Sequence, residues 1–214
     1  EERLAKIFGH PITITGAGRT DAGVHAYGQV VSFLTTGSIP VHKIPLAAKS
    51  VLPSDIVVLH AEMVAPEFHA RKSAKSKIYV YRLYLHDMPS PFYRNYAWHI
   101  NRALEICDMH EAAQILVGTH DFSAFRAAGG EAVNPVRTIL EASCSRQGDM
   151  AEFTFWGTGF LYHMVRNLVG TLVDVGLGKI TAGDFARILK SRDRKQAGIT
   201  APPQGLYLKS VLYD

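Results

Sequence analysis

The chain has 214 residues, 47% of them hydrophobic, which is enough to bury one large core or two compact halves. No apolar run approaches the roughly 18 residues of a membrane span, and no signal peptide opens the chain, so neither membrane insertion nor secretion is supported. The two isolated cysteines favour a reducing, cytoplasmic location, and the formal net charge of +4 favours an anionic partner.

The first half of the chain predicts strands more often than helices. Segments rich in β-branched and aromatic residues are expected to be strands, namely ITIT (12–15), GQVVSFLT (28–35), DIVVLHAEMV (55–64) and KIYVYRLYL (77–85). The last of these alternates most cleanly, with Tyr79, Tyr81 and Leu83 on one face. A short helix is expected over about 43–50. The first two strands flank GAGRTDAG (16–23), so this glycine-rich loop is expected to join strand to strand.

The second half mixes helices and strands without strict β-α-β alternation. Apolar periodicity and end signals predict helices at 102–118, 161–176 and 181–192. Strands are expected at 138–147, 150–159 and 205–213, the first two joined as a hairpin at Gln147-Gly148-Asp149. This order predicts an α+β fold, with a largely antiparallel mixed sheet and helices packed on one face.

The glycine-rich loop 16–23 does not fit a phosphate-binding loop. The pattern G-x-G-x-x-G needs glycine where Asp21 stands, and no Gly-Lys-Ser/Thr follows. The chain beyond the loop continues as an extended segment instead of opening a helix, and a carboxylate would repel phosphate. A purely structural alternative stays open, in which Arg19 and Asp21 pair with each other on the surface of a hairpin.

Other catalytic motifs have weaker support. The stretch His110-Glu111-Ala112-Ala113-Gln114 has glutamine where the zinc-protease motif H-E-x-x-H needs its second metal ligand. Neither G-x-S-x-G nor the zinc-deaminase combination of H-x-E with P-C-x-x-C occurs. The sequence therefore predicts no metal site and no activated serine.

Three further features point in the same direction as a functional role for the loop. Arg166 lies in a helix with almost no polar face, so a buried position would require an acidic partner. Tyr79 and Tyr81 follow a basic stretch, and aromatic rings beside cations stack bases while the cations hold phosphates. Positive charge recurs at Arg71, Lys72, Lys75, Lys77, Arg126, Arg137, Lys190, Arg192, Arg194 and Lys195. Each feature has a structural alternative: core packing for Tyr79, solvent contact for Arg166, and a solvated helix end for the cluster at 190–195.

Taken together, these motifs resemble those of the TruA family of tRNA pseudouridine synthases. GAGRTDAGVHA (16–26) is similar to the catalytic motif of that family, FHARKSA with the following KIYVY (68–81) to its second signature, and FLYHMVRNLVGTLVDVG (160–176) to its third. HDFSAFR, NPVRTI and GLYL are also similar to family segments. The resemblance runs from about residue 7 to the end. The first strand of the family has no counterpart, so the sheet is expected to lack it.

The resemblance implies isomerisation of uridine to pseudouridine in the anticodon stem-loop of tRNA, without a cofactor or metal. It implies that Asp21 is the catalytic carboxylate and Arg166 its partner. Tyr79 would stack on the uracil, Arg19 would hold the target nucleotide out of its helix, and Leu206 would form an apolar wall. The resemblance also implies a homodimer. Residues 1–214 would form one catalytic domain, whose two halves (about 1–75 and 76–214) flank the active-site cleft.

Two other functions stay open at this stage. The first is a catalytically inactive tRNA-binding module of the same fold. The second is a base-excising glycosidase that uses the same Asp21, although no obvious second carboxylate accompanies it in the sequence.

Overall fold

The structure is a computed structural model that describes residues 1–129 and 134–214. The chain divides into two compact units, and each is built from two separate segments. The small unit consists of Glu1–Arg19 and Val30–Ala74, and the large unit of Thr20–Gln29 and Lys75–Asp214. The glycine-rich loop therefore changes unit between Arg19 and Thr20, so Asp21 belongs to the large unit. The expected cleft between two halves stays a prediction.

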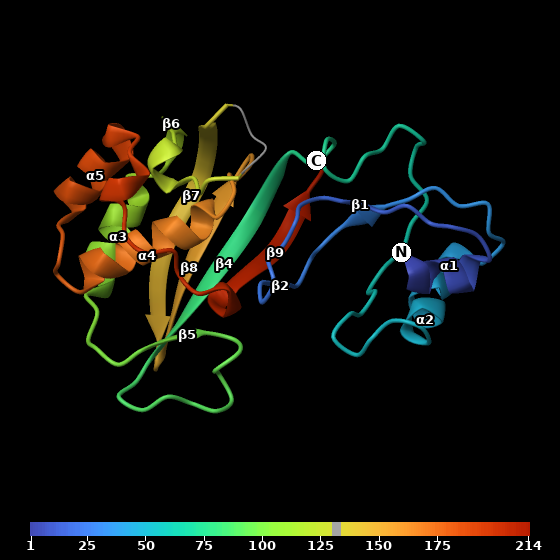
Figure 1. Ribbon diagram of the computed structural model, residues 1–214, viewed down its shortest axis with the longest axis horizontal. Helices are drawn as coiled ribbons and strands as arrows, with labels where there is room; N and C mark the ends of the chain where they lie inside the picture. Colours follow the sequence, from blue (N-terminus) through green and yellow to red (C-terminus); the bar gives the residue numbers. More distant parts are fainter. Residues whose placement is uncertain (130–133) are drawn as a thin grey trace. The chain divides into compact units, whose positions relative to one another are not determined.

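The large unit contains a mixed sheet of seven strands (Figure 1). In chain order they are β2 (His25–Ala26), β4 (Ser76–Leu85), β5 (Trp98–Ile100), β6 (Gly118–Asp121), β7 (Val136–Gln147), β8 (Met150–Gly157) and β9 (Leu206–Leu212). The order across the sheet is β2-β9-β4-β8-β7-β6, and β5 pairs with one end of β4. Only the β2–β9 and β4–β5 pairs are parallel. The predicted α+β fold with a largely antiparallel sheet is confirmed.

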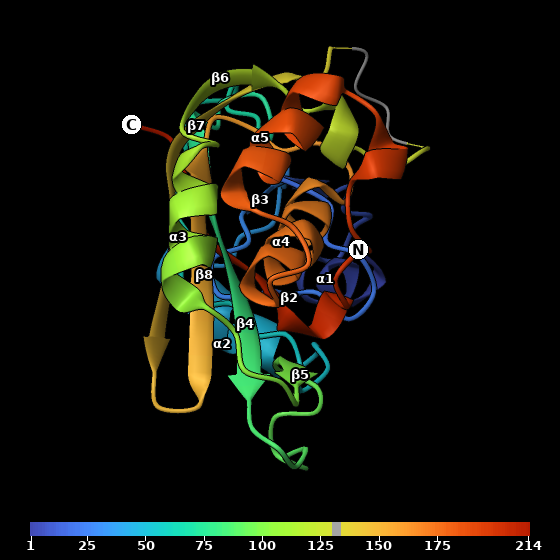
Figure 2. The same cartoon turned by 90° about the vertical axis from the view of Figure 1, so that its left-hand side faces the viewer.

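Three helices cover one face of this sheet, as the two views in Figures 1 and 2 show. They are α3 (Ile106–Gln114), α4 (Met164–Gly176) and α5 (Ala182–Ser191). Short 3₁₀ turns separate the longer elements at η2 (Ser123–Phe125), η3 (Arg194–Gln196) and η4 (Pro203–Gly205). The predicted cap of α5 is present, because Thr181 and Asp184 form a reciprocal capping box. Within the described residues, no helix is long and apolar enough to span a bilayer.

The core of the large unit lies between the sheet and the helices. Alternate strand residues, among them Tyr81, Phe153 and Phe155, face Leu168 and other apolar residues of the helices and are fully buried. The hydroxyl of Tyr81 donates to the carbonyl oxygen of Pro202 at 2.7 Å. Tyr81, which the sequence placed beside Tyr79 as a candidate for base stacking, is therefore a core residue.

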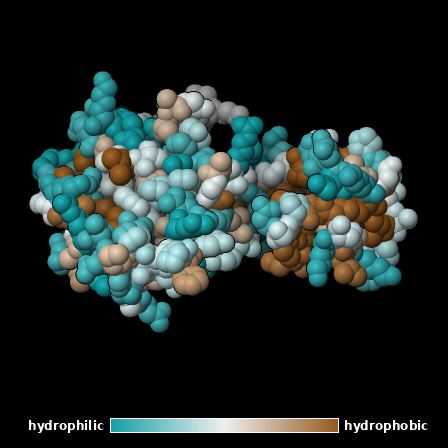
Figure 3. All heavy atoms as spheres, turned by 60° about the horizontal axis from the view of Figure 1, so that its bottom comes forward, coloured by the Kyte–Doolittle hydropathy of each residue, from teal (hydrophilic) through white to brown (hydrophobic). Residues whose placement is uncertain are grey.

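The small unit has less regular structure. It contains α1 (Glu2–Phe8), η1 (Val41–Lys43), α2 (Ile44–Lys49) and a two-stranded antiparallel ladder of β1 (Thr15–Gly16) with β3 (Val31–Ser32). Its core consists of Leu4, Phe8, Ile12 and Ala48 with partly buried neighbours. Apolar side chains also gather on its surface, seen in brown at the right of Figure 3. The exposed ones include Leu34, Leu46, Ile56, Val57, Leu59 and Met63.

Several sequence expectations are corrected by the structure. The strand expected at 55–64 is wrong, because this segment is irregular and pairs with no strand of the described residues. The strands expected at 12–15 and 28–35 shrink to the two-residue strands β1 and β3. The hairpin at 147–149 is confirmed, and Gly148 supplies the positive φ of 59° that its turn needs.

Candidate active site

Asp21 is held at the edge of the large sheet by a tight turn. The backbone N–H of Val24 donates to the carbonyl oxygen of Asp21 at 2.9 Å. Gly23 has a φ of 82°, and a Cβ there would also lie 3.2 Å from the side chain of Pro203. The chain then enters β2, which pairs with β9 through His25 and Tyr207. The positive φ of Gly23 and its close approach to Pro203 explain why glycine stands between Asp21 and β2.

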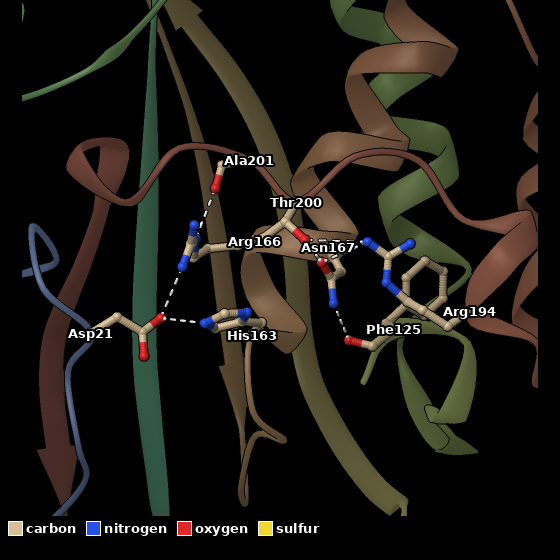
Figure 4. A network of polar contacts seen from close by, with 8 residues as sticks. All are labelled: Asp21, Phe125, His163, Arg166, Asn167, Arg194, Thr200 and Ala201. Carbon is tan, nitrogen blue, oxygen red and sulfur yellow. Dashed lines mark hydrogen bonds and ion pairs between the residues drawn. The ribbon is translucent and has the colours of Figure 1, made fainter. Parts of the chain in front are cut away.

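Arg166 lies on the first turn of α4 and forms an ion pair with Asp21 (Figure 4). Its Nη1 is 2.9 Å from Oδ2 of Asp21, and its Nε donates to the carbonyl oxygen of Ala201 at 2.7 Å. The Arg166 side chain is only 13% exposed, so it does not reach for solvent. Asp21 and Arg166, which are far apart in the sequence, therefore form a pair, and Asp21 is the acidic partner that the buried arginine was expected to need.

His163 makes a second contact with the same carboxylate oxygen, and the sequence reasoning missed it. Its Nε2 lies 3.0 Å from Oδ2 of Asp21. Burial lowers the pKa of His163 below the usual histidine value; Asp21 opposes this shift, while Arg166 and Arg194 reinforce it. In the sequence, the sign of a role for His163 is its position three residues before Arg166, at the start of the helix. Because the chain contains ten histidines, this position does not single it out.

A polar network behind Arg166 fixes the segment 194–201 against α4 (Figure 4). Asn167 is fully buried, and its Nδ2 donates to the carbonyl oxygen of Phe125 at 2.8 Å. Its Oδ1 accepts from Thr200 Oγ1 at 2.6 Å and from Arg194 Nη2 at 3.1 Å. Arg194 was expected among a run of surface charges, but it is half-buried and organises this segment instead.

Tyr79 stands on β4, with its ring edge-on to Phe160 at a centroid distance of 4.9 Å. Burial raises the pKa of Tyr79 to about 12, and the nearby charge of Asp21 adds to the rise. The phenol is therefore neutral at physiological pH. Within the described residues its hydroxyl has no hydrogen-bond partner, so it can donate to or accept from a ligand.

The two other predicted site residues lie in different places. Leu206 is buried at the start of β9, where it is in register with Tyr81 of β4. Arg19 is exposed and ends the first segment of the small unit. The structure thus brings Asp21 and Arg166 together with His163, and the part of Arg19 in the site stays a prediction.

The remaining basic positions do not form one uniform surface. Arg192 caps α5 and pairs with Asp121, with its Nε 3.2 Å from Oδ2. Arg137 donates to the carbonyl oxygens of Asn134 and Val136. Lys190 and Lys195 are exposed, as the solvated-helix-end alternative expects.

The arrangement supports chemistry by a carboxylate. Both donors, from Arg166 and His163, fall on Oδ2 of Asp21, and no described residue bonds to Oδ1 (Figure 4). An ionised carboxylate with one free oxygen can act as a nucleophile or a general base. Among residues 1–129 and 134–214, no group of three His, Cys, Asp or Glu side chains could hold a metal ion.

Comparisons with known proteins assign the chain to a family. The family model described as tRNA pseudouridine synthase matches residues 1–71 and 112–214. The chain is 48% identical to tRNA pseudouridine synthase A of Thermoanaerobacter sp. (strain X514), over 100% of this chain and 87% of that protein. It is 47% identical to tRNA pseudouridine synthase A of Bacillus subtilis (strain 168), over 95% of this chain and 82% of that protein. The chain belongs to the tRNA pseudouridine synthase family, and it is an isomerase.

Proposed function

We propose that this chain converts uridine to pseudouridine in the anticodon stem-loop of tRNA, with Asp21 as the catalytic carboxylate and without a cofactor or metal. The observation that carries the proposal is the ion pair of Asp21 with the largely buried Arg166. The family membership supports the reaction type, and the names of the relatives support tRNA as the substrate. The choice of the anticodon stem-loop rests on the resemblance to the TruA family.

The reaction is an isomerisation, so it needs no co-reactant. The bond from ribose C1′ to N1 of uracil breaks, the uracil turns, and C1′ bonds to C5. C5 then loses its proton and N1 gains one, which leaves the atoms and electrons balanced. Asp21 acts either by attacking the sugar or base as a nucleophile or by removing a sugar proton, and both roles require the ionised carboxylate.

Arg166 supports that ionised form. A cation that donates a hydrogen bond to a carboxylate stabilises its charge, and this stabilisation grows when RNA excludes water from the site. The second bond of Arg166, to the carbonyl oxygen of Ala201, holds its guanidinium in place before RNA binds. The arginine is therefore preorganised to keep Asp21 ionised until the carboxylate attacks or takes a proton.

The other residues of the proposal act on the flipped nucleotide. Extracting a base from a stem costs a few kcal/mol, which stacking and phosphate contacts must offset. Tyr79 would stack on the uracil and exchange a hydrogen bond through its free hydroxyl. Arg19 would keep the nucleotide out of the helix, and Leu206 would form an apolar wall of the pocket. A homodimer that binds tRNA with both subunits is part of the same proposal.

The test is tritium release from tRNA transcripts that carry uridine labelled at C5, because the label leaves only when C5 becomes the attachment point. We expect Asp21→Asn to bind the transcript with the affinity of the parent and to release no tritium. Asp149→Asn, in the exposed turn of the β7–β8 hairpin, is the matched control and should release tritium at the parental rate. Release by Asp21→Asn would refute the proposed role. Free uracil as the product would indicate a glycosidase, and binding without release by the parent would indicate a tRNA-binding module.

A further inference from the structure

We propose that His163 is a positioning residue, whose neutral imidazole donates from Nε2 to Oδ2 of Asp21 and leaves Oδ1 as the oxygen that reacts. The inference rests on the proposed role of Asp21. It adds a residue and a choice of oxygen that neither the motifs nor the family resemblance supplied.

The first argument is that the two donors converge on one oxygen. Arg166 Nη1 and His163 Nε2 lie 2.9 Å and 3.0 Å from Oδ2. An ionised carboxylate only accepts hydrogen bonds, so the imidazole must carry its proton on Nε2. Figure 4 shows both contacts ending on Oδ2, while no dashed line reaches Oδ1. Two donors on one oxygen restrict the rotation of the carboxylate, and the reacting oxygen is thereby preselected.

The second argument is the backbone of His163. It has a φ of 56° and a ψ of 8°, a left-handed conformation that few residues other than glycine adopt. Of the non-glycine residues that the structure describes, only His163 and Arg192 have a positive φ. Such strain persists where the surroundings fix it, and it gathers at functional sites. Here the left-handed conformation places His163 just before α4, which begins at Met164, and it brings the imidazole to Asp21.

The third argument concerns charge. The groups that face the imidazole are Asp21 from the loop, Arg166 from α4 and Arg194 from η3, and the ring of Tyr162 stacks on it at 3.9 Å. The lowered pKa of His163 keeps the imidazole neutral at physiological pH. A second cation beside Arg166 would draw the negative charge of Asp21 toward Oδ2 and make Oδ1 a weaker nucleophile. Protonation of His163 should therefore slow the reaction.

Two substitutions separate positioning from folding. His163→Gly accepts the left-handed backbone without strain but removes the imidazole. His163→Gln keeps an N–H donor near the position of Nε2 and cannot gain a proton. We expect His163→Gly to bind tRNA as the parent does and to lose turnover roughly tenfold to a hundredfold, because small displacements of a reacting group have effects of this size. We expect His163→Gln to recover part of that loss.

The deciding measurement is the pH profile of single-turnover tritium release between about pH 5 and pH 8, where histidine titrates. The parent should lose activity as the pH falls through the lowered pKa of His163, and His163→Gln should lose this acidic limb. An unchanged limb in His163→Gln, or parental turnover in His163→Gly, would overturn the inference. If Asp21→Asn is inactive while both His163 variants match the parent, only the positioning role fails; if Asp21→Asn is active, the proposed function itself fails.

A spectroscopic measurement tests the geometry without turnover. Nuclear magnetic resonance of ¹⁵N-labelled imidazoles reports the tautomer and the pKa of His163 in the free protein. We expect the proton on Nε2, a pKa below the usual value of about 6.5, and a further fall of the pKa in Asp21→Asn, since the carboxylate favours the protonated form. A proton on Nδ1 or an unchanged pKa in Asp21→Asn would overturn the inference.

Discussion

Arg166 holds two partners with one guanidinium, and this geometry makes its replacement costly. Nη1 contacts Asp21 while Nε contacts the carbonyl oxygen of Ala201, and the single ammonium of lysine cannot reproduce that fork. We expect Arg166→Lys to lose about tenfold or more in turnover, and Arg166→Ala also to lower the free energy of unfolding by about 1–2 kcal/mol, since a charge-assisted bond is lost and Asp21 is left unpaired.

Single-turnover tritium release and urea denaturation would measure the two effects of replacing Arg166. Arg94→Ala, at an exposed position between β4 and β5, is the control and should match the parent in both assays. Parental activity in Arg166→Ala would contradict the proposal that this arginine keeps Asp21 ionised.

The residues of the site differ in how visible they are in the sequence. Asp21 stands out because a carboxylate on a glycine-rich loop has few structural uses, and Arg166 because its helix offers almost no polar face. His163 and Asn167 carry no such mark. Their roles depend on a left-handed backbone at residue 163 and on a network that closes through Thr200, features that arise only when distant segments pack together.

At the level of elements, α4 and the segment 194–201 depend on one glycine. A Cβ at Gly170 would lie 1.8 Å from the carbonyl oxygen of Ile199, which is backbone and cannot turn aside. We expect Gly170→Ala to displace this segment, to lower the free energy of unfolding by about 1–3 kcal/mol through overpacking, and to reduce turnover, because Ala201 in this segment holds Arg166.

Urea denaturation together with tritium release would test the effect of Gly170→Ala. The matched control is Gly183→Ala in α5, where a Cβ would meet only an ordinary contact of 3.6 Å with Thr181. Alanine is the better helix former by up to about 1 kcal/mol, so the control should be neutral or stabilising. Equal effects at the two glycines would show that the close approach of Ile199 is unimportant.

The elements whose residues alone determine their conformation were predicted well. Elements that depend on pairing with a distant segment were not. The alternation of 77–85 and the turn at 147–149 are local, and β4 and the β7–β8 hairpin follow them closely. The segment 55–64 has the composition of a strand but no pairing neighbour among the described residues, and β-propensity without pairing does not make a strand. The helix expected from residue 161 begins at Met164, because His163 is left-handed.

At the scale of the whole molecule, the two units should differ in stability. The small unit buries a short set of apolar residues, whereas the core of the large unit extends over a seven-stranded sheet and three helices. We expect amides of residues 1–19 and 30–74 to exchange with deuterium much faster than those of β4, β8 and α4, since local opening follows the depth of packing. Hydrogen exchange followed by mass spectrometry would measure this difference, and uniform protection across both units would contradict it.

The pairing of β2 with β9 also has a consequence for the synthesis of the protein. Asp21 leaves the ribosome before the strand that anchors its loop, β9, and Arg166 follows Asp21 by 145 positions. At about 5–20 residues per second, a nascent chain waits on the order of ten seconds between the two. A polypeptide that ends between residues 201 and 205 contains every polar group of the proposed reaction but lacks β9, the strand that holds the loop of Asp21 in place. We therefore expect activity to require synthesis of β9, and a chain truncated between residues 201 and 205 to leave tRNA unmodified.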